Sequence, residues 1–203
     1  KFLFEFVDRG CEDEVALRTN RGALDHIKLN PRMLVGVADR TQETTLFGKK
    51  QSMPICIAPT GAAGLMYYQG EIELARAARE AGIPCTLATG SISSMEEIAE
   101  KAGGRLWFQL YMWSDRRLSQ ELVKRAGAAG YEALIVTVDS IIHPNREYNY
   151  HNGYTRPFTF NRRNVTDVLT HPRWMCGVLA RYMMTTGMPR FANMPEKIGR
   201  AHV

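Results

Sequence analysis

The central part of the chain alternates short apolar runs with amphipathic segments. The apolar runs lie at 54–58, 84–88, 106–111 and 133–138. Continuous apolar runs of this length are typical of parallel strands buried on both faces. Between them, segments 71–81, 93–102 and 114–130 have apolar residues at helical spacing. The pattern therefore predicts four successive strand–helix units and a parallel sheet.

Local signals mark where these elements begin and end. Ser94 followed by Glu97 is typical of a helix start, and Gly82 and Gly130 are natural helix stops. Upstream of the first run, the pattern predicts a helix end at 1–7, a short helix near 12–20 and a hairpin at 44–49.

Two architectures fit four strand–helix units, namely an open doubly wound sheet and a (β/α)8 barrel. A polar residue near the end of each strand favours the barrel. A complete barrel has eight such units over roughly 250 residues. We therefore expect an α/β fold that is about the first half of a (β/α)8 TIM barrel.

The regular pattern stops after Asp139. Residues 155–197 contain four prolines and only one helix-like stretch, at 173–184. Ile198–Val203 spells the peptide encoded by a common sequencing adapter, so we interpret 198–203 as an artefactual tail. The expected organisation is a half-barrel at 1–154, a basic proline-containing loop at 155–197 and the tail at 198–203.

Composition and charge narrow the function classes. Apolar residues make up 45% of the 203 residues, and no apolar run is long enough to span a bilayer. The net charge is +5, but residues 1–154 have 18 basic and 19 acidic residues, whereas 155–203 have 8 and 2. A basic tail beside a neutral core argues against a nucleic-acid-binding protein. The four cysteines lack metal-site spacing, so we expect free thiols, with Cys56 and Cys85 buried in strands.

Candidate site residues lie at the predicted carboxyl ends of the strands, where the ligands of parallel α/β folds bind. They are Thr60, Gln109, Tyr111 and Thr137, with Arg146 shortly after the last strand. The Gln amide suits the edge of a heterocycle such as a flavin, and Arg suits a carboxylate. The small residues after Pro59 would let a flat ligand approach the backbone. The set indicates a site for a planar polar cofactor and an acid.

Other candidates are weaker. Asp139 is an acid–base candidate, although a strand-end Asp more often caps the next turn. His143 and His151 have no partners at metal-ligand spacing, and surface histidines are the more common interpretation. No metal site is expected.

Several motifs, in order over residues 3–154, resemble the FMN-dependent α-hydroxy-acid dehydrogenase/oxidase family. The motifs are Gly10–Glu14, Met53–Ile55 with Pro59–Gly61, Trp107–Tyr111, and Val136–Asp139 with Arg146. His171–Trp174 and Gly187–Pro189 are similar to the mandelate and lactate dehydrogenase branch.

The resemblance implies an FMN-containing barrel that oxidises a small L-2-hydroxy acid to the 2-oxo acid, as an oligomer in its full-length form. It implies Pro59, Thr60 and Gly61 along the flavin, with Gln109 and Thr137 bonded to its ring. It implies Tyr111 and Arg146 on the substrate.

The chain departs from the family at three points. A family Tyr that reaches the substrate is Phe6, and a Ser near the flavin is Ala88. The family's histidine base and phosphate-binding loops belong to the second half of its barrel, so no catalytic residue is assigned here and we expect the fragment to be inactive. A non-catalytic flavin-binding or interaction protein, or another FMN barrel oxidoreductase, is the alternative.

Arginines alternate with aromatic residues and methionines in segment 155–197. This composition fits contact with a membrane surface, as the resemblance to the dehydrogenase branch also implies. A mobile surface loop is an equally good interpretation, given the prolines. The expected location is cytoplasmic, either free or peripheral on the inner face of the membrane.

Overall fold

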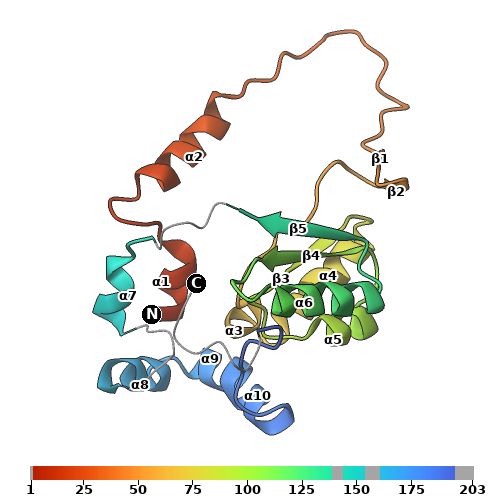
Figure 1. Ribbon diagram of the computed structural model, residues 1–203. Helices are drawn as coiled ribbons and strands as arrows, with labels where there is room; N and C mark the ends of the chain where they lie inside the picture. Colours follow the sequence, from red (N-terminus) through yellow and green to blue (C-terminus); the bar gives the residue numbers. More distant parts are fainter. Residues whose placement is uncertain (1, 139–143, 154–160, 195–203) are drawn as a thin grey trace. The chain divides into compact units, whose positions relative to one another are not determined.

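A computed structural model describes residues 2–138, 144–153 and 161–194 (Figure 1). The chain divides into two compact units, each formed by two stretches of sequence. Unit 1 comprises 1–41 and 142–175, and unit 2 comprises 42–141 and 176–203. Unit 2 contains the sheet and all the candidate site residues except Arg146, which belongs to unit 1.

Three parallel strands form the sheet of unit 2: β3 (Cys85–Ala88), β4 (Leu106–Tyr111) and β5 (Ala133–Thr137). They lie side by side in chain order, with β4 in the middle (Figure 1). Helix α5 (Met95–Lys101) connects the first two strands and α6 (Arg116–Ala128) the last two, while α4 (Gly70–Glu80) precedes β3. The predicted strand–helix order is confirmed from α4 to β5.

The two faces of the sheet have different roles. On one face, Leu87, Phe108 and Leu110 pack into an apolar core with α4, α5 and α6. The helices supply the rest of that core from residues spaced along one side, which include Ile72, Ala75, Met95, Ile98, Leu122 and Ala126. The opposite face bears the polar side chains, because successive residues of a strand point to opposite sides.

Side-chain caps fix where the connecting helices begin. The Ser94 hydroxyl accepts a hydrogen bond from the Glu97 N–H (3.1 Å), and the Asp115 carboxylate accepts one from the Arg117 N–H (3.0 Å). Each cap satisfies an N–H group that has no partner within its helix. Both caps follow directly from the local sequence.

A hairpin of β1 (Thr44–Leu46) and β2 (Lys49–Gln51) contacts the amino end of the sheet, and the hairpin predicted at 44–49 is confirmed. Glu132, just before β5, accepts hydrogen bonds from Lys49 (2.6 Å) and Arg105 (3.0 Å). Desolvation alone would raise the pKa of Glu132, but these two bonds outweigh it and the pKa lies below its ordinary value.

The prediction of four strand–helix units is wrong for the described residues, which contain three strands in this sheet. Segment 54–58 makes only an isolated bridge, in which Ile57 pairs with Cys85. The Ile57 N–H donates to Pro84 O, and Thr86 N–H donates to Ile57 O, both at 2.9 Å. Pro59 has no N–H to extend this ladder, and the Ile55 N–H donates to Met53 O (2.9 Å) instead of to β3.

Because segment 54–58 is not a strand, the prediction for one of the four cysteines, Cys56, is wrong. All four are free thiols, as predicted. Cys85 is buried in β3, and desolvation raises the pKa of its thiol to about 11. Cys56 is exposed, because its segment is not a buried strand, so the prediction that it is buried is wrong.

The described part of the tail is largely helical. It forms α8 (Arg162–Leu169), α9 (Pro172–Trp174), a π-helical turn η1 (Met175–Leu179) and α10 (Ala180–Thr185). The last three coincide with the helix-like stretch predicted at 173–184. The segment 198–203, interpreted as artefactual, lies outside the described residues.

Two buried side chains anchor the second stretch of unit 2 to its first stretch. The Tyr182 hydroxyl accepts a hydrogen bond from the Gln69 N–H (3.0 Å), and desolvation raises the pKa of this phenol to about 12. Asn193 is 1% exposed and bonds to the loop after β3. Its Oδ1 accepts from Met95 N–H (3.2 Å), and its Nδ2 donates to Ser91 Oγ (2.7 Å).

Unit 1 contains α1 (Phe2–Asp8) and α2 (Val15–His26) from its first stretch, and α7 (Glu147–Asn152), α8 and α9 from its second. Helix α2 has no buried residue, and 27–43 form no helix or strand. Helices α1 and α7 contact each other, for example through Asn152 Nδ2, which donates to Glu5 Oε2. No helix in the described residues is both long and apolar enough to cross a membrane.

Candidate active site

Gln109, near the carboxyl end of β4, is the centre of the candidate site in unit 2. Its side chain is 3% exposed and bonded at both ends. Its Nε2 donates to Thr137 Oγ1 (2.7 Å), and its Oε1 accepts from the Thr89 N–H (3.2 Å). Two of the predicted residues, Gln109 and Thr137, are thus joined by a direct hydrogen bond between neighbouring strands.

The strand register explains why these two side chains lie within hydrogen-bond distance. Tyr111 pairs with Thr137, and Gln109 pairs with Ala88 on one side and Ile135 on the other. Gln109, Tyr111 and Thr137 therefore lie on the face opposite the apolar core. Tyr111 is partly buried at the last position of β4.

The turn at Pro59, Thr60 and Gly61 lies beside the loop after β3. The Ala62 N–H donates to Gly90 O (2.8 Å), which brings this turn next to the end of β3. The three turn residues are exposed, and the only hydrogen bond of the Thr60 hydroxyl among the described residues is a long one to Ala58 O (3.5 Å). An exposed turn beside buried strand ends is suited to contact a ligand.

Arg146 belongs to unit 1. Its Nη1 donates to Phe6 O (3.3 Å), and its guanidinium lies 5.1 Å from the centre of the Phe6 ring. A cation–π contact of this kind holds the guanidinium over the aromatic face. The structure thus brings together two positions that the resemblance assigns to the substrate.

Of the weaker candidates, the structure describes only His151. Asp139 and His143 lie outside the described residues. His151 is exposed in α7. No group of three or more His, Cys, Asp or Glu side chains within 2–138, 144–153 and 161–194 could hold a metal ion.

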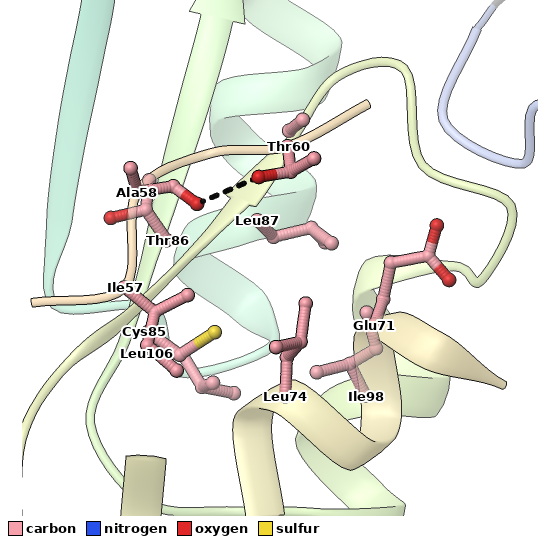
Figure 2. A pocket seen from close by; sticks show the side chains of 11 residues that line it. Ile57, Ala58, Thr60, Glu71, Leu74, Cys85, Thr86, Leu87, Ile98 and Leu106 are labelled. Carbon is pink, nitrogen blue, oxygen red and sulfur yellow. Dashed lines mark hydrogen bonds between the residues drawn. The ribbon is translucent and has the colours of Figure 1, made fainter. Parts of the chain in front are cut away.

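A small cavity lies beneath the turn, between segment 57–60, β3 and α4 (Figure 2). Its lining is mostly apolar and includes Leu74, Leu87 and Ile98. Its volume of about 10 Å³ is close to that of one water molecule. This space is a packing gap in the core and is far too small for a cofactor.

Thr89 is a site residue that the sequence analysis missed. It is fully buried, and its hydroxyl donates to Gln109 O (2.5 Å) and accepts from the Tyr111 N–H (3.4 Å). A hydroxyl residue directly after a buried strand was the available signal. Asn193 was missed as well, because nothing in its local sequence indicates contact with a loop about a hundred residues earlier.

Comparison with known proteins assigns the family. The model of the FMN-dependent dehydrogenase family matches residues 1–200. The chain belongs to the FMN-dependent dehydrogenase family. FMN is the cofactor of this family, and its solved structures include a mandelate oxidase variant with an FMN adduct.

Relatives in this family include two well-matched dehydrogenases. The chain is 37% identical to (S)-mandelate dehydrogenase of Pseudomonas putida over 95% of its own length and 48% of the relative's. It is 40% identical to L-lactate dehydrogenase of Azorhizobium caulinodans, over 87% of its own length and 46% of the relative's. The chain therefore spans about half the length of the curated relatives it matches.

Solved structures similar to this chain belong to the same kind of enzyme as these relatives. A structure described as that of the monotopic membrane protein (S)-mandelate dehydrogenase matches 97% of the chain and 51% of its own length, with a TM-score of 0.87 and 36% identity. A mandelate oxidase structure with (S)-mandelic acid matches 76% of the chain and 46% of its own length, with a TM-score of 0.72 and 41% identity.

The residues present fit one edge of a flavin. After its two internal bonds, the Gln109 amide retains one N–H donor and one lone pair on Oε1. Thr137 accepts from Gln109, so its own hydroxyl proton is available to a ligand. A buried amide with unused capacity on both its atoms suits a heterocycle that alternates acceptors and donors.

Proposed function

We propose that the full-length protein uses FMN to oxidise an L-2-hydroxy acid, of the lactate or mandelate type, to the 2-oxo acid, within a complete (β/α)8 barrel. The observation that supports this most directly is the Gln109–Thr137 bond, which joins two flavin-edge candidates from neighbouring strands. The named relatives act on lactate or mandelate.

The residues have distinct proposed roles. Pro59, Thr60 and Gly61 would lie along the flavin, and Gln109 and Thr137 would bond to the edge of its ring. Tyr111 and Arg146 would bind the substrate, with Arg146 pairing with the carboxylate. FMN, when bound, supplies a two-electron acceptor, so the substrate carbon loses its hydrogen and the hydroxyl its proton.

The test uses the full-length gene product. It should purify yellow with one FMN per chain, and L-lactate or L-mandelate should bleach the flavin absorption under anaerobic conditions. A yellow protein that neither acid nor any other 2-hydroxy acid bleaches would instead support a non-catalytic flavin-binding protein. Phe6 and Ala88, which replace family hydroxyl residues, are the features that favour this second candidate.

We further propose that the 203-residue chain alone neither turns over substrate nor retains FMN firmly. Leu134 and Val136 of β5 are 41% and 43% exposed, which leaves apolar surface without cover. The residues present would meet the flavin only at the Pro59–Gly61 turn and at the edge bonded to Gln109 and Thr137. Oxidation of a 2-hydroxy acid by this chain, measured with a dye acceptor and added FMN, would contradict the proposal.

Contact of segment 155–197 with a membrane surface is proposed as well. In α10 and the following turn, Met183, Met184 and Met188 are 55%, 78% and 50% exposed, and Arg181 is exposed beside them. Exposed methionines next to arginines suit an interface with anionic lipid. One relative is described as a monotopic membrane protein.

Sedimentation with anionic liposomes at low salt tests this contact. Met183→Gln with Met184→Gln should reduce the bound fraction severalfold. The matched control, Met112→Gln, changes a 50% exposed methionine elsewhere and should have no effect. Equal binding by all three proteins would refute the assignment to α10.

A further inference from the structure

We propose that Thr89 is a positioning residue of the cofactor site: its backbone N–H fixes the direction of the Gln109 amide, and its hydroxyl holds the backbone of Gln109, so that together they set the hydrogen-bond pattern offered to the flavin. This inference rests on the proposed function, since it assumes that Gln109 meets FMN. Thr89 itself is fully buried and acts through Gln109.

The backbone N–H of Thr89 decides which way the amide points. An N–H group can only donate, so it requires the carbonyl oxygen of Gln109 to face it, at 3.2 Å. The reversed amide would set its NH₂ group against the Thr89 N–H, donor against donor. Thr137 does not decide the direction, because a hydroxyl can either donate or accept.

This direction determines what the site offers to a ligand. Gln109 Nε2 must donate to Thr137 Oγ1, so the Thr137 hydroxyl directs its own proton elsewhere. The ligand then meets a donor from Nε2, an acceptor at Oε1 and a second donor from Thr137. A carbonyl next to an N–H, as in the pyrimidinedione ring of a flavin, is complementary to the Nε2 donor and the Oε1 acceptor beside it, and the Thr137 hydroxyl adds a second donor on the Nε2 side.

The hydroxyl of Thr89 holds the strand to which Gln109 belongs. It donates to Gln109 O (2.5 Å) and accepts from the Tyr111 N–H (3.4 Å), so it bonds to the backbone on both sides of Leu110. Loss of this hydroxyl would leave buried backbone groups without their partner. Gln109 would then be less well held for the flavin.

The experiment compares three variants in the full-length, FMN-loaded protein. Thr89→Val removes the hydroxyl, and Thr89→Ser keeps it. Thr86→Val is the matched control, because Thr86 is 3% exposed in β3, the strand that ends just before Thr89, and its Oγ1 has no hydrogen-bond partner among the described residues. The readouts are the FMN dissociation constant, from flavin fluorescence, and the absorption spectrum of the bound flavin.

Thr89→Val should weaken FMN binding about threefold to tenfold, as expected for one net hydrogen bond, and shift the flavin absorption. Thr89→Ser and Thr86→Val should stay within about twofold of the parent and leave the spectrum unchanged. If Thr89→Val and Thr86→Val behave alike in both readouts, the inference is overturned.

A double variant tests whether Thr89 acts through Gln109. In a Gln109→Met background, adding Thr89→Ala should leave FMN binding unchanged, whereas in the parent it should weaken binding as Thr89→Val does. Equal losses in both backgrounds would show a structural role only and overturn the inference. Should the parent protein itself fail to bind FMN, the proposed function fails first, which is a distinguishable result.

Discussion

Strands β4 and β5 pair along five residues, yet their surroundings differ greatly. Phe108 and Leu110 of β4 are at most 1% exposed under the helices. Their register partners in β5, Leu134 and Val136, point to the same side of the sheet and are 41% and 43% exposed. Hydrogen-bonded pairing therefore does not by itself provide burial.

The difference comes from the helices. A central parallel strand is covered by the crossover helices on both sides of it, and β4 lies between α5 and α6 in the chain. Strand β5 lies at the edge of the sheet and keeps its apolar side largely exposed within the described residues. Leu134 and Val136 thus have the apolar character of a buried strand without its cover, in a chain that spans about half the length of its relatives.

The largest expected effect on stability comes from a matched pair of leucine substitutions, one in β4 and one in β5. Leu110→Ala should lower the free energy of unfolding by about 2–5 kcal/mol, because it leaves a cavity in the core. Leu134→Ala, on the same side of the sheet, should cost under about 1 kcal/mol in this chain. Urea titrations measure both values. Equal costs would show that β5 is as well covered as β4.

A smaller loss of stability is expected from a substitution at Asn193, which bonds to the loop after β3. Asn193→Ala should cost about 1–3 kcal/mol, because it leaves buried groups of the Ser91–Met95 loop without their partner. Faster hydrogen exchange of the Met95 amide would locate the effect. Asn145→Ala, which removes an exposed side chain, is the control and should leave stability unchanged.

The amino end of β5 should show a pH-dependent effect. The pKa of Glu132 is lowered in the folded protein, so its ion pairs stabilise the fold above the ordinary carboxyl pKa and cease to do so as pH falls through the folded value. Glu132→Gln should cost about 1 kcal/mol at pH 7. The cost should shrink below the ordinary Glu pKa of 4.5.

Unfolding titrations at neutral and acidic pH measure this change. Exposed Glu100→Gln provides the comparison and should alter stability at neither pH. A cost for Glu132→Gln that is the same at both pH values would mean that charge plays no part in holding the hairpin to β5.

The smallest change in stability is expected for Val136→Lys. This residue is already 43% exposed, so a lysine should alter the free energy of unfolding by less than about 0.5 kcal/mol. It should instead reduce self-association of the chain, measured by light scattering, because charge blocks an exposed apolar edge. Unchanged self-association would indicate that copies of the chain do not associate through β5.

Local sequence determined most of the sheet in unit 2. Apolar runs gave β4 at its observed bounds, and β3 and β5 within a residue, because a buried strand needs a continuous apolar segment. Ser94 and Asp115 marked the helix starts because their side chains bond to backbone N–H groups two or three residues away. The family motifs likewise reside in short contiguous segments, and the family itself is confirmed.

Tertiary structure decided the rest. An apolar run could not reveal that segment 54–58 makes a single bridge, since pairing depends on which N–H groups reach β3. The bond from Gln109 to Thr137 and the burial of Thr89 depend on strand register, to which residues far apart in sequence contribute. Asn193 lies beside Ser91 only because the chain returns there. Sequence thus specified the candidate groups, and long-range packing fixed their partners and the direction of their hydrogen bonds.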